Sequence, residues 1–123
     1  MLNMSGSDRL DLALGAIAHP TRRRILRLLT KGDARVTDLA GEFDVSLNAV
    51  SRHIQVLERS GLVRRRLHGR EHVLSLDTRP LDTAAAWIDQ QRTAWSARLR
   101  AMDEALHRED EATAQHRARR ERK

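Results

Sequence analysis

The chain has 123 residues, of which 40% are hydrophobic and 33% are charged, and its formal net charge is +6 at pH 7. This length allows one domain with a core of its own, no apolar run approaches the ~20 residues of a membrane span, and Met1–Ser7 show no signal-peptide pattern. Because cysteine is absent, disulfides, thiolate nucleophiles and thiolate metal ligands are excluded, and we expect a cytoplasmic protein.

Two helices are predicted first. Asp8–Ala18 has apolar residues at i, i+4 and i+7, as one face of a helix requires. These residues are Leu10, Leu14 and Ile17. His19 and Pro20 interrupt this helix, and proline suits the first position of the next one, Thr21–Thr30. We expect the second helix to bury its leucines and to expose its arginines, among them Arg22.

A short helix and a longer one follow. Thr37–Phe43 is predicted as the short helix, with Thr37 as its N-cap. Ser46 is then expected to cap a helix that runs to about Arg59 and has a single apolar stripe. The stripe consists of Val50, Ile54 and Leu57. Gly61 favours the left-handed conformation that ends a helix.

The pattern then changes to two extended segments, Leu62–Leu67 and Glu71–Leu76. His68, Gly69 and Arg70 connect them, which predicts a β-hairpin. Four arginines lie on this hairpin. They are Arg64, Arg65, Arg66 and Arg70. Taken alone, they fit a solvated strand edge as well as a DNA contact; after a helix with a polar face, DNA binding is the favoured interpretation.

A long helix is predicted from about Asp82, after Arg79–Pro80. It carries a heptad seam in which seven of eight positions are apolar. The seam consists of Leu81, Ala85, Ile88, Arg92, Trp95, Leu99, Met102 and Leu106. We therefore predict a DNA-binding domain over residues 8–79, a dimerisation helix over 80–108 and a disordered charged tail over 109–123.

Basic charge is concentrated in separate blocks. The net charge is +5 over Pro20–Lys31, +4 over Ser46–His72 and +4 over the last twelve residues. The intervening blocks, Gly32–Val45 and Asp77–Glu111, each sum to −3. This alternation predicts a positive face of the kind that binds nucleic acid.

The order of elements is that of a helix-turn-helix followed by a wing. We predict a mainly α fold with about five helices and a small β-hairpin, assembled as a dimer. A helix that reads the major groove needs a polar outer face, while arginines nearby can hold the phosphate backbone. The predicted DNA contacts are Ser46, Asn48, Ala49, Ser51, Arg52, Gln55, Arg64, Arg66, Arg70 and Arg22.

The runs His19–Leu29 and Val45–Val63 resemble the ArsR/SmtB family of bacterial repressors. The resemblance covers about Leu10–Leu106. It implies a homodimer joined by its first and last helices, an operator with two-fold symmetry and release by an effector. The predicted dimer contacts are Leu10, Leu14, Ile17, Ile88, Trp95, Leu99, Met102 and Leu106. The long last helix is similar to that of a non-metal-sensing subgroup.

Two features of the family's metal sensors are missing or altered. Many members carry a cysteine pair in the third helix, where this chain has no thiol. Asp103, His107 and Glu111 share one helical face, but they fit surface ion pairs better than a metal site across a dimer. We expect no metal and no cofactor. Trp87 and Trp95 could line an effector pocket, although packing is favoured, and His53 fits a half-buried packing histidine better than a base contact.

The sequence therefore favours a homodimeric transcriptional repressor that binds double-stranded DNA. Such a repressor could act on its own gene. Whether a small-molecule effector exists is left open, and no membrane partner is expected. The alternative is a protein-interaction module that uses the winged-helix surface as an antitoxin-like or regulatory subunit. An enzyme is not expected, because no assembled active site is recognisable.

Overall fold

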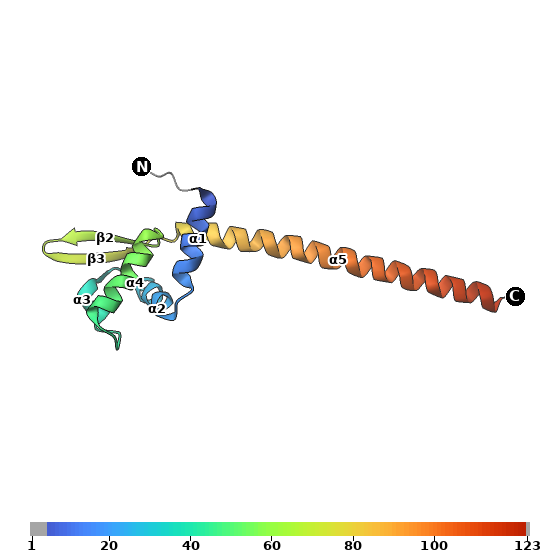
Figure 1. Cartoon of the computed structure of the whole chain (residues 1–123), viewed down its shortest axis with the longest axis horizontal. Coiled ribbons are helices and arrows are strands. Elements are labelled where there is room, and N and C mark those ends of the chain that lie inside the picture. Colours follow the sequence, from blue (N-terminus) through green and yellow to red (C-terminus); the bar gives the residue numbers. More distant parts are fainter. Residues whose placement is uncertain (1–4, 123) are drawn as a thin grey trace. The chain divides into compact units, whose positions relative to one another are not determined.

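A computed structural model describes residues 5–122. Met1–Met4, part of the segment expected to lack a signal peptide, and Lys123, the end of the expected tail, lie outside the described residues. The chain forms two compact units, one up to Ala85 and the other from Ala86 onward. The elements, labelled in Figure 1, are α1 (Gly6–Ile17), α2 (Pro20–Leu29), β1 (Ala34–Arg35), α3 (Val36–Ala40), α4 (Leu47–Arg59), β2 (Val63–His68), β3 (Glu71–Leu76) and α5 (Arg79–Glu121).

The expected winged helix-turn-helix with five helices is confirmed. Strands β2 and β3 form an antiparallel hairpin, hereafter the wing, whose register pairs Val63 with Leu76 and His68 with Glu71. A third strand, β1, was not predicted; it pairs with β3 and gives the sheet the order β1-β3-β2. Its two residues are too few to produce a recognisable alternation of apolar and polar side chains.

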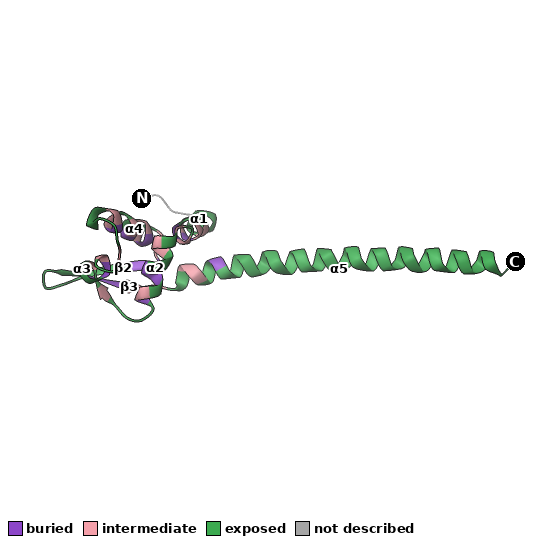
Figure 2. Cartoon of the chain, turned by 90° about the horizontal axis from the view of Figure 1, so that it is seen from below, coloured by how far each residue is buried: buried purple, intermediate pink, exposed green. Residues whose placement is uncertain are grey.

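The core of the first unit lies between the helices and the wing. Its largest fully buried side chains come from α2, α4 and the sheet region, and purple segments in Figure 2 mark where they lie. They are Ile25, Val50, Ile54, Leu57, Leu62 and Leu74. Burying each such side chain stabilises the fold by roughly 1.5–3 kcal/mol. The three from α4 are the predicted apolar stripe, so this helix is fixed along one face.

Two helices start at residues other than those predicted, one because of a local cap and one because of strand pairing. In α1 the helix begins two residues early, because Ser5 and Asp8 form a capping box with N–O distances of 3.1 and 3.3 Å. In α3 the predicted N-cap Thr37 is wrong. The cap position is Arg35, which β1 holds by pairing with Val73, so the helix starts directly after the strand.

The ends of α4 agree with the sequence. Ser46 Oγ accepts a hydrogen bond from the Ala49 N–H at 3.1 Å, the expected N-cap. Gly61 has φ +80°, and the Leu62 N–H donates to the Leu57 carbonyl at 3.1 Å. In the hairpin turn, Gly69 has φ +64°, which glycine adopts without steric cost.

Helix α5 continues to Glu121, so the predicted disordered tail after residue 108 is wrong for the described residues. The segment 109–121 has no apolar stripe, but alanine, glutamate, glutamine and arginine are good helix formers and continue the helix without packing. Within residues 5–122, no helix combines the length and apolar character needed to cross a membrane.

Candidate DNA-binding surface

One face of α4 is exposed and polar. Asn48, Arg52 and Gln55 follow one another at intervals of four and three residues, and all three are exposed. They occupy the side of the helix opposite the buried stripe, because a stripe of period 3.6 leaves the other positions outside. An amide, a guanidinium and a second amide in one row can donate and accept hydrogen bonds at base edges.

The remaining predicted contacts on α4 lie at its first turn and beside this row. Ala49 and Ser51 are half-buried, so they offer short side chains at the margin of the exposed face. Ser46 is exposed, and although its Oγ accepts the capping hydrogen bond, the hydroxyl proton stays available for a phosphate oxygen. The structure brings all six predicted α4 positions to the N-terminal and outer part of one helix.

Leu47 was not predicted as a contact, yet its side chain is 54% exposed at the first residue of α4. It lies three residues before Val50 and so extends the apolar stripe in the sequence, which predicts burial. The stripe is buried only from Val50 onward because α4 meets the core beyond its first turn. An exposed leucine there can contact the methyl group of thymine.

The wing presents three predicted contacts, two of which hold ion pairs. Arg64 pairs with Asp77 at 3.1 Å, and Arg66 pairs with Asp33 at 2.8 Å. Both guanidinium-bearing side chains are more than half exposed, so these surface pairs are weak and can exchange with a phosphate. Arg70 stands at the hairpin turn and forms no ion pair with any residue that the structure describes.

Arg65 has a different role from its neighbours. Its guanidinium donates two hydrogen bonds to Glu58 of α4, at 2.7 and 3.2 Å, and the two side chains are 29% and 30% exposed. This pair joins the wing to α4. The sequence alone does not show which arginine pairs with Glu58, because Arg64 and Arg66 were equal candidates.

Arg22 was predicted to contact DNA, but the structure uses its side chain internally. Its guanidinium donates to the carbonyls of Ala16 and Gly15, at 2.7 and 2.9 Å, at the C-terminal end of α1. A third nitrogen lies 3.2 Å from Nδ1 of His53 on α4. Arg22 therefore ties α1 to α4, and we remove it from the proposed DNA contacts.

His53 is half-buried, as expected for a packing histidine. Its ring lies 4.4 Å from the ring of His19, which caps α2 through its own Nδ1. The pKa of His53 is lowered by burial, and also by the nearby positive charges of His19 and Arg22. The neutral ring is thus favoured, and it can accept the hydrogen bond from the guanidinium.

A pH dependence follows from this arrangement. Because the folded-state pKa of His53 lies below the unfolded value of about 6.5, the unfolded chain binds more protons below that pH. The contribution of neutral His53 to the free energy of unfolding is complete above pH 6.5 and decreases as the pH falls below that value. We expect the free energy of unfolding, measured with urea at pH 7.5 and 5.5, to fall by less in His53→Gln than in the wild type. An equal fall in both proteins would contradict the assignment.

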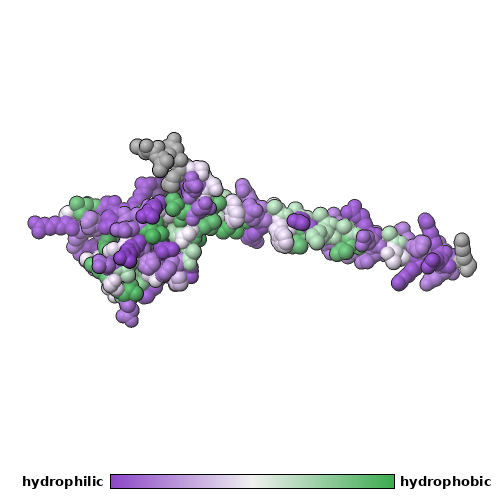
Figure 3. All heavy atoms as spheres, viewed as in Figure 1, coloured by the Kyte–Doolittle hydropathy of each residue, from purple (hydrophilic) through white to green (hydrophobic). Residues whose placement is uncertain are grey.

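The predicted dimer residues of α5 are exposed along the helix, and Figure 3 shows apolar surface there before the charged C-terminal end. The exposed members are Ile88, Trp95, Leu99, Met102 and Leu106, with Trp87 beside them. In α1, Leu10, Leu14 and Ile17 are half-buried. Part of Ile17 is already used in the core, because it packs against the buried cluster.

The acidic and histidine residues of α5 do not assemble into a cluster. His107 Nε2 lies 3.6 Å from Asp103 Oδ2, one helical turn away. Within residues 5–122, no group of three or more histidine, aspartate or glutamate side chains is placed to hold a metal ion.

Known proteins resemble this chain over its winged-helix region. The family described as a helix-turn-helix domain matches residues 17–66. The transcriptional repressor SdpR of Bacillus subtilis (strain 168) is 34% identical over 73 residues, which are 59% of this chain and 81% of the repressor.

Two solved structures share the fold. The crystal structure of the ArsR family transcriptional regulator RHA00566 is 33% identical, with a TM-score of 0.70, covering 78% of this chain and 97% of that one. The homodimeric winged helix-turn-helix DNA-binding domain of Mb0332 from Mycobacterium bovis is 26% identical, with a TM-score of 0.58, over 76% of this chain and 90% of that one.

Proposed function

Because the chain belongs to the ArsR family of transcriptional regulators, we propose that it is a sequence-specific DNA-binding repressor that acts as a homodimer on a two-fold symmetric operator. The observation that carries this proposal is the exposed row of Asn48, Arg52 and Gln55, opposite the fully buried stripe of α4. Such a helix can enter the major groove with its polar face while its apolar face stays packed in the core.

Each side chain of the row suits a particular base edge. Arg52 can donate two hydrogen bonds to O6 and N7 of guanine, while Asn48 and Gln55 can each pair with N6 and N7 of adenine. Leu47 and Ala49 add apolar contact with thymine methyl groups at the first turn of the helix. The wing arginines Arg64, Arg66 and Arg70 hold phosphates and so fix the orientation of α4.

The exposed apolar stripe of α5 suits a second copy of the same chain. A stripe that contains tryptophan, leucine and methionine costs free energy in water, and pairing with an identical stripe removes it from solvent. The homodimeric state of the Mb0332 domain supports this assignment. Two reading helices would then enter successive major grooves, about 34–36 Å apart.

The regulator we propose belongs to a subgroup that does not sense metals, and it acts in the cytoplasm, where its operator lies. The absence of cysteine supports the first point, because the thiolate sites of metal sensors have no counterpart in this chain. Repression of its own gene is the simplest arrangement for such a regulator.

Fluorescence anisotropy on the DNA upstream of its gene tests the proposal. We expect binding at least ~1,000-fold tighter than to a scrambled duplex of the same composition. Raising the salt from about 50 to about 200 mM should weaken binding by a factor of about 1,000 or more if six or more phosphates are neutralised. Equal affinity for both duplexes would contradict specific binding. Co-purification of a stable partner protein, with no DNA affinity at low salt, would favour an interaction module instead.

A further inference from the structure

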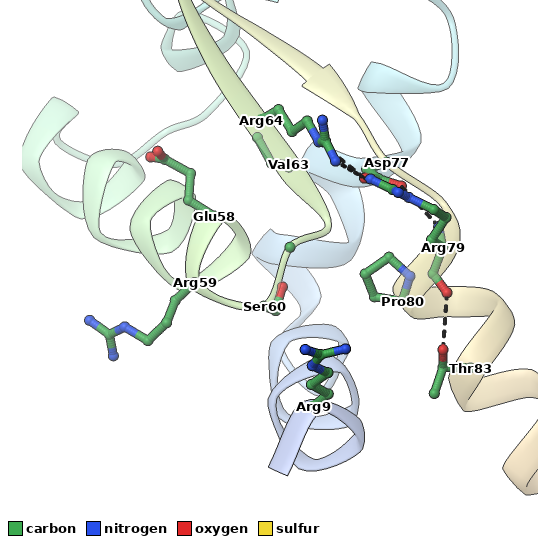
Figure 4. Close-up of a pocket in the computed structure, with 11 residues that line it drawn as sticks. Arg9, Glu58, Arg59, Ser60, Val63, Arg64, Asp77, Arg79, Pro80 and Thr83 are labelled. Atoms are coloured by element: carbon green, nitrogen blue, oxygen red, sulfur yellow. Dashed lines mark hydrogen bonds and ion pairs between the residues drawn. The ribbon is translucent and has the colours of Figure 1, made fainter. Parts of the chain in front are cut away.

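A pocket of about 530 Å³ lies in the winged-helix unit, at the C-terminal end of α4 (Figure 4). Its walls come from four parts of the unit. They are Arg9 of α1, Ser60 and Gly61 after α4, Val63 and Arg64 of β2, and Pro80 and Thr83 in the first turns of α5. We call it the basic pocket, because four of its lining residues are arginines.

Positive charge exceeds negative charge around this pocket. Arg64 and Arg79 share the single carboxylate of Asp77, at 3.1 and 2.6 Å, which leaves one positive charge in excess. Hydrogen bonds from Arg79 hold the pKa of Asp77 far below its ordinary value, so the carboxylate stays ionised. The other acidic wall residue, Glu58, is already paired with Arg65 outside the lining.

Arg9 supplies the available cation. Arg9 lines the pocket together with Ser60 and Pro80 (Figure 4), and its guanidinium forms no ion pair with any residue in the described range 5–122. Arg59 stands at the rim and extends away from the centre in this view. An unneutralised guanidinium at the edge of a concave, partly apolar site attracts a carboxylate or phosphate group.

The size and lining of the pocket fit a small molecule better than a nucleic acid. Pockets for small ligands have volumes of about 300–1,000 Å³ and combine apolar walls with a few polar groups. Here Val63 and Pro80 provide apolar surface, and the hydroxyl groups of Ser60 and Thr83 provide polar atoms. The 13 residues of α4 separate the pocket from the Ser46 end of the helix by roughly 20 Å, which places it away from the base-reading turn.

We propose that the basic pocket binds a small organic anion, whose oxyanion group pairs with Arg9 and whose apolar part lies on Val63 and Pro80, and that this ligand regulates operator binding. The regulatory half rests on the proposed function. A ligand there contacts the end of α4, the base of the wing and the start of α5 at once. A bound ligand would therefore favour one position of α4 relative to β2 and the start of α5, and so change how α4 is presented to DNA.

Titration of the ¹⁵N-labelled full chain tests the site directly. The probes are benzoate and phenyl phosphate, with neutral benzamide as the uncharged control, in a buffer free of phosphate. We expect saturable shifts of the Gly61 and Thr83 amide signals with both anions, and at least tenfold weaker binding of benzamide, because the neutral amide cannot form a charge-assisted hydrogen bond with the guanidinium.

Variants decide whether Arg9 is responsible. Arg9→Gln should weaken binding of both anions about tenfold, whereas Arg27→Gln, on the exposed face of α2 outside the pocket, should leave it unchanged. Thr83→Phe, which fills the pocket, should abolish binding. The site is refuted if neither anion saturates, if benzamide binds as tightly, or if Arg9→Gln binds like the wild type.

The regulatory half has its own measurement. Saturating probe should change the dissociation constant of the operator complex at least ~5-fold in the wild type and leave it unchanged in Arg9→Gln. An unchanged constant in the wild type overturns regulation while the titration upholds the site. Failure to bind any operator would instead overturn the proposed function, and the titration would still decide whether the anion binds.

Discussion

Leu99→Glu is expected to produce a folded monomer whose operator affinity is at least ~100-fold below that of the wild type. Two linked half-site contacts gain about 100- to 10,000-fold from effective concentration, and a monomer forfeits that gain. The substitution lies outside the winged-helix unit, and Leu99 is 46% exposed in the single chain. The fold of the DNA-binding part should therefore be unaffected.

The size of this effect follows from symmetry. Each substitution enters the interface twice, so two leucines that would each contribute about 1.5–3 kcal/mol on full burial are lost. Two carboxylates must also be buried in an apolar seam or the helices must separate, and separation costs less. The flanking seam residues Trp95 and Met102 cannot compensate, because they would pack against the same charged position.

Ala97→Glu is the matched control, since it places the same charge two residues away on the opposite face of α5. We expect this variant to remain dimeric and to bind the operator like the wild type. Analytical ultracentrifugation gives the oligomeric state, and anisotropy gives the affinity. A monomeric Leu99→Glu protein with undiminished affinity would show that one half-site suffices.

Local patterns in the sequence were enough to locate α4 and its polar face. The spacing of Val50, Ile54 and Leu57 defines the buried side, and Ser46 and Gly61 define the two ends through cap chemistry that depends only on nearby residues. The wing was predicted for the same reason, since a hairpin is a local structure with a short glycine-containing turn.

Features that depend on distant partners could not be predicted. Arg22 looks like any exposed arginine of α2, and only the fold brings the carbonyls of α1 within reach of its guanidinium. The same holds for Arg66 and Asp33, which are far apart in the chain but adjacent across the sheet. The exposure of Leu47 also depends on the tertiary fold, because the core contacts α4 only beyond its first turn.

The basic pocket belongs to this second class of feature. Ten of its eleven lining residues lie in two segments, 58–64 and 77–83, but these segments are separated by the wing, and the remaining lining residue comes from α1. Arg9 in particular lies in an ordinary amphipathic helix. A binding site assembled from segments that are distant in the sequence is visible only once those segments are placed together.

Arg52→Ala is expected to weaken operator binding by about 1–3 kcal/mol, which is a factor of roughly 5 to 150, and to leave binding to scrambled DNA nearly unchanged. Arg52 stands at the centre of the exposed row, between Asn48 and Gln55, and its side chain forms no hydrogen bond or ion pair with the described part of the chain. Its guanidinium is thus available for a base, and its removal should not destabilise α4.

Arg52→Lys distinguishes a base contact from a phosphate contact. Lysine keeps the charge but loses the planar pair of donors that matches O6 and N7 of guanine. If Arg52 reads a base, anisotropy should show that Arg52→Lys loses specific affinity and relaxes preference at one operator position, while the salt dependence stays as in the wild type. If Arg52 holds a phosphate, Arg52→Lys should bind nearly normally, and Arg52→Ala should lose affinity equally on all sequences with a shallower salt slope.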